Sequence, residues 1–323
     1  MKLGIVGTGM IVNICLDALQ EIDNISTTSI WGRAQDFNQI NQLSLKYKIE
    51  NCFTDYSEFL KSDIDVVYLG IINNLHYQYA LEALQAGKNV ICEKPFTTTL
   101  KEAKHLQEIA TASNLMIFEA ITLIYSPNYH YIKENLNKIG DIKLVVANYS
   151  QYSSRYNQYM SGNVLPAFDP KMWGGALYDI NVYNLHFIQG LFGKPKNVEY
   201  HANIGFNGID TSGMVMLDFE HFKAVCVGAK DCNGINQVVI QGTNGYIKLN
   251  SAANVCLEVI LFDGKQEVTN LNKNDNHMVN ELIAFEDIYR NNDFTKCYQL
   301  LTHSVELMEV LEKARRSANL KFG

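Results

Sequence analysis

Three side chains in this sequence are of types that hold or move a proton. Lys94 follows a short apolar run, and Asp179 and Tyr183 stand four residues apart behind a pair of glycines. Side chains four residues apart on an α-helix share one face, so the carboxylate and the phenol can meet the same substrate group. A positioned phenol can exchange a proton with a hydroxyl or carbonyl group. Lys94, Asp179 and Tyr183 are therefore the candidate catalytic residues.

Each of these residues also has an ordinary structural explanation. A lysine at the end of a strand is often only a solvated charge. An aspartate near the start of a helix is favoured by the helix dipole, whatever its chemistry. A tyrosine on an amphipathic helix is commonly half-buried. The catalytic interpretation therefore depends on the elements that position the three side chains.

A glycine-rich turn near the N-terminus is a second chemical feature. It separates an apolar strand, Leu3 to Val6, from a helical stretch, Ile11 to Ile22. Glycine allows a tight turn there and lets a pyrophosphate approach the N-terminus of a helix, whose free N–H groups favour anions. The third position of this fingerprint is usually Gly or Ala, and here it is Val12. We predict that the dinucleotide is bound by Gly7, Thr8, Gly9, Met10 and Ile11, with a purely structural turn as the alternative.

The end of the second predicted strand, Ile25 to Trp31, bears on the choice of cofactor. NAD sites usually carry Asp or Glu there, where it binds the ribose hydroxyls. This chain has Gly32 and Arg33 instead. A guanidinium suits phosphate geometry, so Arg33 favours NADP over NAD. A solvated surface arginine is the alternative.

The first third of the chain alternates apolar strands with helical stretches. Such alternation predicts a doubly wound parallel sheet, a Rossmann domain of residues 1–119. Ligands of such sheets bind beyond the carboxyl ends of the strands, which is where Lys94 would stand. Further strands are expected at Val66 to Gly70, Asn89 to Cys92 and Leu115 to Phe118, and helices at Leu75 to Ala86 and, behind a capping box, at residues 99–112.

After about residue 120 the pattern changes to repeated strands. They predict a C-terminal α/β domain of residues 120–323, with a large, mostly antiparallel open sheet that binds substrate and mediates oligomerisation. Hairpin signals lie at residues 242–245 and 263–264. Strands are expected at 142–149, 198–202, 211–219, 222–229, 237–241, 246–250 and 257–262, and helices at 127–137, 175–192, 277–291 and 297–317.

The bulk properties of the chain exclude several classes of protein. Its 323 residues suit two domains, and its net charge of −7 offers no basic face for nucleic acid. No apolar run reaches the roughly 18 residues that span a bilayer, and no signal peptide is recognisable, so we expect a cytoplasmic protein without a membrane partner. The seven cysteines form no C-x-x-C pair, which argues against a disulfide framework and a metal site.

Taken together, the motifs resemble those of the Gfo/Idh/MocA oxidoreductase family. The tyrosine at position 183 and the run Leu311 to Arg316 are similar to the branch that holds trans-1,2-dihydrodiol dehydrogenase and glucose–fructose oxidoreductase. The matching pieces follow the family's order: residues 4–9, Asn73 to His76, Ala86 to Val90, Glu93 to Pro95, Glu119-Ala120, Gly174 to Tyr183 and residues 242–245.

The resemblance implies roles for individual residues. Lys94 would lie by the nicotinamide ribose and the substrate oxygen, Tyr183 would be the proton donor or acceptor, and Asp179 would orient the substrate. A free phenol has a pKa of about 10, and a nearby ammonium such as that of Lys94 lowers it. A cis peptide would precede Pro95. Asn73, Glu93 and His76 would line the cofactor site, although His76 equally suits the start of a helix.

Three departures from the family pattern stand near the expected pocket. Ile72 replaces a usual proline, Asn181 replaces a glycine, and Ile124 stands where relatives often carry an arginine. The substrate is therefore expected only by class: a sugar, polyol or cyclic diol, oxidised or reduced by a homodimer or homotetramer. A non-catalytic, NAD(P)-sensing regulator on the same fold is the alternative. Further pocket candidates are Trp173, Tyr178, Arg155 and Tyr156.

Overall fold

The computed structural model describes residues 1–323 and divides them into two compact units. Unit 1 comprises residues 1–120 and 276–305, and unit 2 comprises residues 121–275 and 306–323. Residues 276–305 are far from residues 1–120 in sequence, but they belong to unit 1 because α9 (Met278–Arg290) packs on that unit. The ring of Phe285 on α9 stacks on the ring of Phe118, with 4.6 Å between the ring centres. The functional division into residues 1–119 and 120–323 stays a prediction.

Unit 1 is built on a six-stranded parallel sheet with the strand order β3-β2-β1-β4-β5-β6. This is the predicted Rossmann sheet, and the fold class is confirmed. The strands are β1 (Lys2–Val6), β2 (Ser26–Trp31), β3 (Asn51–Phe53), β4 (Val66–Leu69), β5 (Asn89–Glu93) and β6 (Ile117–Ala120). The helices are α1 (Met10–Leu19), α2 (Phe37–Tyr47), α3 (Tyr56–Lys61), α4 (His76–Gln85), α5 (Leu100–Ala112), α9 and the first part of α10 (Phe294–Ser317).

The stretch between Arg33 and Lys61 holds three elements that the sequence pattern did not reveal. Helix α2 carries only a thin apolar stripe, and β3 is three residues long, which is too short for an alternating pattern. Helix α3 has a clearer signal, because the side chain of Asp55 accepts a hydrogen bond from the Glu58 amide at its N-terminus. Of these three elements, β3 completes the edge of the sheet next to β2.

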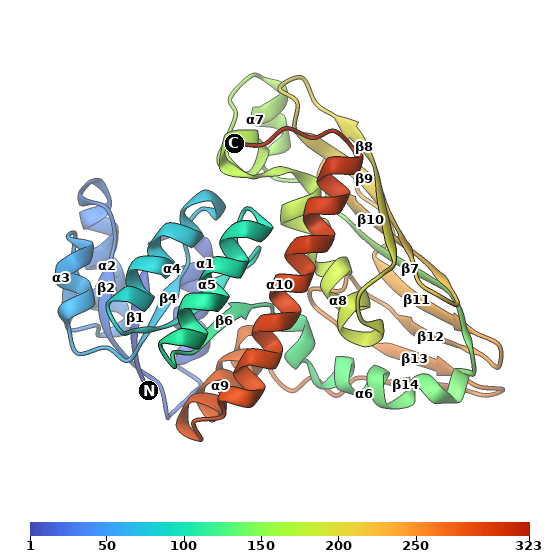
Figure 1. Cartoon of the computed structure of the whole chain (residues 1–323), viewed down its shortest axis with the longest axis horizontal. Coiled ribbons are helices and arrows are strands. Elements are labelled where there is room, and N and C mark those ends of the chain that lie inside the picture. Colours follow the sequence, from blue (N-terminus) through green and yellow to red (C-terminus); the bar gives the residue numbers. More distant parts are fainter. The chain divides into compact units, whose positions relative to one another are not determined.

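Unit 2 is built on an eight-stranded sheet with the order β14-β13-β12-β11-β7-β10-β9-β8. Only β10 and β7 pair in parallel, so the sheet is mostly antiparallel, as predicted. Helix α8 (Val182–Phe192) packs on one of its faces (Figure 1). The strands are β7 (Ile142–Ser150), β8 (Asn197–Ile204), β9 (Asp210–Asp218), β10 (Lys223–Ala229), β11 (Gln237–Gly242), β12 (Tyr246–Leu249), β13 (Val259–Phe262) and β14 (Gln266–Thr269), and the other helices are α6 (Pro127–Asn135), α7 (Tyr156–Met160) and the end of α10.

The helix predicted over residues 175–192 is only partly an α-helix. Residues Leu177–Asn181, labelled η7, form a π-helical turn, and α8 starts at Val182. Gly175 before it has a φ of +91°, a left-handed conformation that glycine adopts without strain. π-Helical turns are rare and often occur at functional sites.

No helix in the structure combines the length and the apolar character that crossing a membrane requires.

Candidate active site

The glycine-rich turn has room for a dinucleotide phosphate at Gly9 but not at Gly7. Gly7 has a φ of +110°, and a Cβ added there would lie 2.4 Å from the carbonyl oxygen of Gly70, so the fold itself requires this glycine. A Cβ added at Gly9 would meet no atom within 4 Å. Gly9 also caps α1 without any side-chain hydrogen bond, which leaves the first N–H groups of the helix open to an anion. The open space and the open amides suit a pyrophosphate.

Val12 at the third fingerprint position is accommodated by a glycine on the neighbouring strand. A Cβ added at Gly70, just after β4, would lie 2.6 Å from Cγ2 of Val12. Val12 is fully buried. Close packing of helix and strand, which the fingerprint usually achieves with a small residue on the helix, is here achieved by Gly70.

Arg33 follows β2 at the same edge of the sheet and is held in a local ion pair. Its Nε lies 2.7 Å from Oδ2 of Asp36, and its Nη2 lies 3.3 Å from Oδ1. The hydrogen bond to Asp36 raises the pKa of the guanidinium. The Arg33 side chain is 63% exposed, so further N–H groups remain accessible to a phosphate.

His76, at the start of α4, is fully buried, and both of its ring nitrogens lie against backbone carbonyls. Nδ1 is 2.9 Å from the Pro95 oxygen, and Nε2 is 3.1 Å from the Ile71 oxygen. Burial lowers the pKa of the imidazole, although both carbonyls favour its protonated form. This arrangement favours a bracing role for His76, beneath the turn that carries Lys94, over direct contact with cofactor. Half-buried Asn73, in contrast, lies in the 3₁₀ turn after β4.

Lys94 directly follows β5 and is half-buried, and the Lys94–Pro95 peptide is cis, as predicted. Glu93 beside it is buried and accepts a hydrogen bond of 2.7 Å from the hydroxyl of Tyr68. Burial raises the pKa of Glu93 to about 7. The cationic side chain of Lys94 thus stands next to a carboxyl group that titrates near neutrality.

Two more buried carboxyl groups share this region of unit 1. Glu119 accepts a hydrogen bond of 2.9 Å from the Phe96 amide, which fixes the chain after the cis peptide. Glu281 on α9 is fully buried, neither of its oxygens has a hydrogen-bond partner, and burial raises its pKa well above the ordinary value. No motif singles out Glu281, because this residue comes from a helix far along the chain.

In unit 2, Asp179 lies in the π-helical turn and Tyr183 on the first turn of α8. Both side chains are partly exposed. The ring of Tyr183 lies 6.0 Å from that of Tyr149 on β7. The Asp179 carboxylate forms an ion pair of 2.7 Å with the buried ammonium of Lys230, a residue that the sequence analysis did not single out. A buried lysine directly after a strand has no sequence signal of its own.

The substitution at Asn181 concerns packing on the sheet. Asn181 is fully buried, donates a hydrogen bond of 2.9 Å to the Cys226 carbonyl of β10, and accepts one from Asn184. A Cβ added at Gly228 would lie 2.8 Å from the Cβ of Asn181, so a glycine on the strand makes room for this side chain. The side chain of Asn181 thus packs on the sheet, and the effect of this departure on the substrate pocket stays a prediction. Ile72 has a φ of −73°, close to the value that proline would impose.

The carboxylate of Asp210 holds the start of the π-helical turn. Its Oδ2 accepts hydrogen bonds from the Leu177 amide, 2.6 Å away, and from the Tyr200 hydroxyl, 2.7 Å away. Burial raises the pKa of Asp210 to about 6. A Cβ at Gly175 would clash with Asp210, at 2.1 Å from Oδ1, so the glycine before the turn makes room for this carboxylate.

The aromatic pocket candidates lie in packed clusters of unit 2. Trp173 is buried and packs edge-to-face on Tyr178, which is fully buried. Tyr156 lies between the rings of Tyr152 and Tyr159. Arg155 is exposed and precedes α7. Ile124 is half-buried, in the 3₁₀ turn of residues 122–125.

The candidate residues thus fall into two groups. The cofactor candidates of unit 1, together with Lys94, follow the carboxyl ends of β2, β1, β4 and β5, which are neighbours in the sheet and therefore share one edge. Asp179 and Tyr183 lie on adjacent turns in unit 2. A Rossmann sheet with an open phosphate turn and a strand-end lysine is the arrangement expected of a nucleotide-dependent oxidoreductase.

Comparison with known proteins identifies the family. Residues 1–121 match the family model of oxidoreductases with an NAD-binding Rossmann fold, GFO_IDH_MocA, and residues 133–248 match the GFO/IDH/MocA C-terminal domain. The chain belongs to the Gfo/Idh/MocA oxidoreductase family, as the motifs predicted. The predicted enzyme class, an NAD(P)-dependent oxidoreductase, is confirmed as well.

Relatives with assigned names are similar over most of the chain. The scyllo-inositol 2-dehydrogenase (NADP(+)) IolU of Bacillus subtilis (strain 168) is 29% identical, over 100% of this chain and 98% of its own. The uncharacterized oxidoreductase YgjR of Escherichia coli (strain K12) is 31% identical over 79% of both chains. The trans-1,2-dihydrobenzene-1,2-diol dehydrogenase of Xenopus laevis is 29% identical over 77% of this chain and 75% of its own.

A solved structure shows the same fold. KijD10, a 3-ketoreductase from Actinomadura kijaniata in complex with NADP and TDP-benzene, superimposes with a TM-score of 0.85. The alignment covers 98% of this chain and 97% of that chain at 19% identity.

Proposed function

We propose that this enzyme transfers a hydride between NADP and a CH–OH group of a cyclic polyol, sugar or diol. The observation that carries the proposal is the similarity over the full chain to a relative named as an NADP-dependent inositol dehydrogenase. A relative named as a dihydrodiol dehydrogenase supports the same substrate class, since both names describe ring compounds with neighbouring hydroxyl groups.

In this proposal, the substrate-derived proton moves through Tyr183. During oxidation the hydroxyl proton passes to the Tyr183 oxygen as the carbinol carbon loses its hydride, and the reverse reaction returns that proton to the carbonyl oxygen. The nicotinamide, when bound, supplies the hydride acceptor or donor. The ammonium of Lys94 favours the phenolate form of Tyr183, and Asp179 orients a substrate hydroxyl.

For the cofactor, we propose that the phosphate turn from Gly7 to Ile11 holds the pyrophosphate and that Arg33 meets the 2′-phosphate. Gly9 supports the first assignment, because its side-chain position opens into free space. The exposed, always charged guanidinium of Arg33 supports the second. Asn73 and Glu93 are proposed to line the nicotinamide end of the site.

Tyr183→Phe tests the catalytic proposal. The variant should bind NADPH as the wild type does and should lose turnover of scyllo-inositol or its ketone by about 10²- to 10⁴-fold, the typical contribution of positioned proton transfer. Stopped-flow or steady-state absorbance at the nicotinamide band measures the rate. Tyr129→Phe is the matched control, since the Tyr129 hydroxyl bonds the Phe187 carbonyl of α8.

The outcomes separate the enzyme from a regulator. Unchanged turnover in Tyr183→Phe would remove Tyr183 from the mechanism. If the wild type binds NADPH and turns over nothing in a broad panel of polyols, diols and their ketones, the chain is a cofactor-sensing regulator instead.

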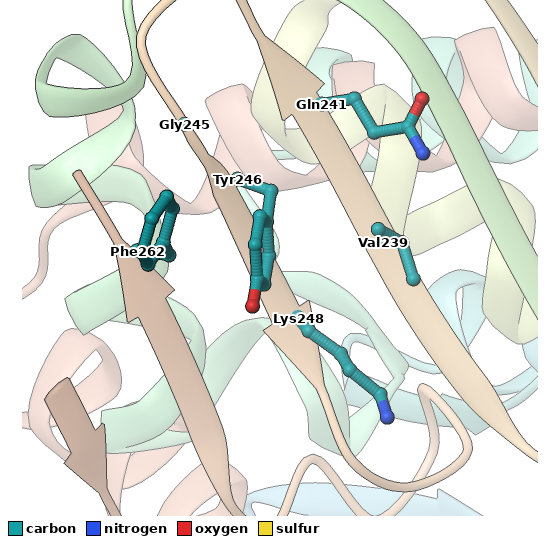
Figure 2. A pocket seen from close by; sticks show the side chains of 6 residues that line it. All are labelled: Val239, Gln241, Gly245, Tyr246, Lys248 and Phe262. Carbon is teal, nitrogen blue, oxygen red and sulfur yellow. The ribbon is translucent and has the colours of Figure 1, made fainter. Parts of the chain in front are cut away.

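We also propose that the chain forms a homodimer or homotetramer through the outer face of the large sheet. Several apolar side chains on that face remain partly exposed. Their exposed fractions are 49% for Leu144, 47% for Met214 and 41% for Met216. A shallow pocket of about 480 Å³ lies on the same sheet, lined by Tyr246 and Phe262 among others (Figure 2). Exposed apolar side chains grouped on one face favour burial against another surface.

A further inference from the structure

Lys230 is a fully buried cation, with 1% of its side chain exposed, directly after β10. Its Nζ lies 2.7 Å from Oδ2 of Asp179 and 2.5 Å from the carbonyl oxygen of Ala167. The same atom lies 4.5 Å from the centre of the Phe168 ring. An ammonium has three N–H donors, and a carboxylate, a carbonyl and an aromatic face supply three partners for them.

The backbone of Lys230 is fixed as well as its side chain. Its amide donates a hydrogen bond of 2.8 Å to the Thr211 carbonyl, and its own carbonyl accepts one of 2.9 Å from the Ser153 amide. Placing an ammonium in the interior is costly unless it is paired and hydrogen-bonded. The carboxylate that pairs with Lys230 is that of Asp179, the candidate substrate-orienting residue.

Asp179 differs from Lys230 in its access to the outside. Its side chain is 35% exposed, so a ligand can reach the carboxylate, while the ammonium behind it is out of reach. An ionised carboxylate accepts hydrogen bonds and donates none. A carboxylate at Asp179 can therefore accept a hydrogen bond from a hydroxyl group but cannot donate one to a carbonyl group.

We propose that Lys230 is a positioning residue that holds Asp179 ionised and oriented to accept a hydrogen bond from a second hydroxyl of the substrate, on the carbon next to the one that is oxidised. This inference rests on the proposed function and sharpens its substrate class to compounds with hydroxyls on adjacent carbons. Asp179 lies in the π-helical turn and Tyr183 on the first turn of α8, so the two side chains come from adjacent turns and are proposed to contact neighbouring oxygens of one substrate.

A structural role for Lys230 alone must be separated from this one. The contacts with Ala167 and Phe168 tie down the loop before the π-helical turn, and Phe168 belongs to a buried aromatic cluster with Tyr159. Loss of Lys230 can therefore loosen the loop and lower all activity together. Only a change in discrimination between two substrates reports on Asp179.

The experiment compares trans-1,2-cyclohexanediol with cyclohexanol, which lacks the second hydroxyl. The ratio of kcat/KM for the two compounds is measured with NADP⁺ for the wild type, Lys230→Met, Asp179→Asn and the double variant. Lys88→Met is the matched control, because the Lys88 ammonium bonds the Ser62 and Ile64 carbonyls and no carboxylate. Thermal unfolding of each variant verifies its fold.

We expect Lys230→Met to reduce the preference for the diol by about 10- to 100-fold, the range for losing a hydrogen bond to a charged group. Asp179→Asn should reduce it similarly, and the double variant should lose little more. An unchanged ratio in Lys230→Met, or an equal loss on both compounds, overturns the role of Lys230 while Asp179→Asn still shows its effect. If Asp179→Asn also keeps the ratio, Asp179 does not bind the second hydroxyl and this inference fails while the proposed function stands. If the wild type oxidises neither these two compounds nor scyllo-inositol and the other polyols and diols of the panel, the proposed function itself fails.

Discussion

Arg33 is the residue on which the choice between NADP and NAD depends. Its guanidinium donates two hydrogen bonds to the Asp36 carboxylate, so a 2′-phosphate must bind to the remaining N–H groups. Arg33→Ala should weaken NADPH binding by about 10-fold or more, the cost of losing a charge-assisted hydrogen bond, and leave NADH binding nearly unchanged. Isothermal titration with both cofactors measures the two affinities.

Asp36→Asn provides the opposing variant. It removes a negative charge next to the expected phosphate and keeps the guanidinium, so NADPH should bind more tightly than to the wild type. Equal losses of NADPH and NADH in Arg33→Ala would instead assign Arg33 to the structure of the turn after β2.

At this scale, sequence can name residues whose type and motif are informative, and it misses those whose role comes from burial. Lys94 is predictable because it follows a strand end within a recognisable motif. Lys230 and Glu281 are an ordinary lysine and an ordinary glutamate in the sequence, and only the fold removes them from water. His76 shows the opposite case, a motif residue whose ring nitrogens are both taken by the backbone.

At the scale of elements, the packing of α1 on β4 shows how a departure from a motif is compensated. Gly70→Ala should destabilise the fold by about 1–3 kcal/mol, because its Cβ would lie within 2.6 Å of Val12. Val12→Ala removes the clashing methyl groups, so the double variant should lose less than the sum of the two single variants. Urea unfolding measures the three values, and strict additivity would show that Val12 does not limit the space at Gly70.

The π-helical turn makes a prediction about pH, since it is anchored by the buried carboxyl group of Asp210. The pKa of Asp210 is raised from 3.8 to about 6, so the native state holds this proton more tightly than the unfolded chain does. The protonated carboxyl group therefore adds to the free energy of unfolding below pH 4, and this stabilisation is lost as the pH rises to about 6. The shift of about two pKa units corresponds to about 3 kcal/mol.

Asp210→Asn removes this titration. Relative to the wild type, the variant should gain about 3 kcal/mol of unfolding free energy between pH 4 and pH 7, measured by urea unfolding across that range. Tyr200→Phe removes a donor that stabilises the ionised form of Asp210. The pH range over which protonated Asp210 stabilises the fold should therefore extend to higher pH in this variant. Parallel stability curves for the wild type and Asp210→Asn would contradict the raised pKa.

The turn also marks the limit of pattern reading for elements. Periodicity and the glycine pair correctly indicate a helix that ends at Phe192, but hydrophobic spacing does not distinguish a π-helical turn from an α-helical one over five residues. The distinction comes from tertiary partners: Asp210 binds the first amide, Asn181 bonds the strand, and Lys230 holds Asp179.

At the scale of the whole molecule, the large sheet has apolar side chains on both of its faces. Helix α8 covers only one of these faces. Antiparallel sheets with one solvated face normally alternate apolar and polar residues. Here β7 presents Leu144 outward and β9 presents Met214 and Met216 outward, all more than 40% exposed. We therefore expect the wild type to be a homodimer or homotetramer in solution.

Met216→Glu tests this arrangement. A charge buried in an apolar interface without a partner is strongly unfavourable, so the variant should dissociate to a smaller species and keep its fold. Leu45→Glu is the matched control, because Leu45 lies on α2 with 82% of its side chain exposed and the same charge there should leave the assembly intact. Light scattering coupled to size-exclusion chromatography gives the mass of each species. A monomeric wild type, or an assembly that survives Met216→Glu unchanged, would leave the apolar face of the sheet without its proposed role, and the contact between subunits would have to be sought on another surface.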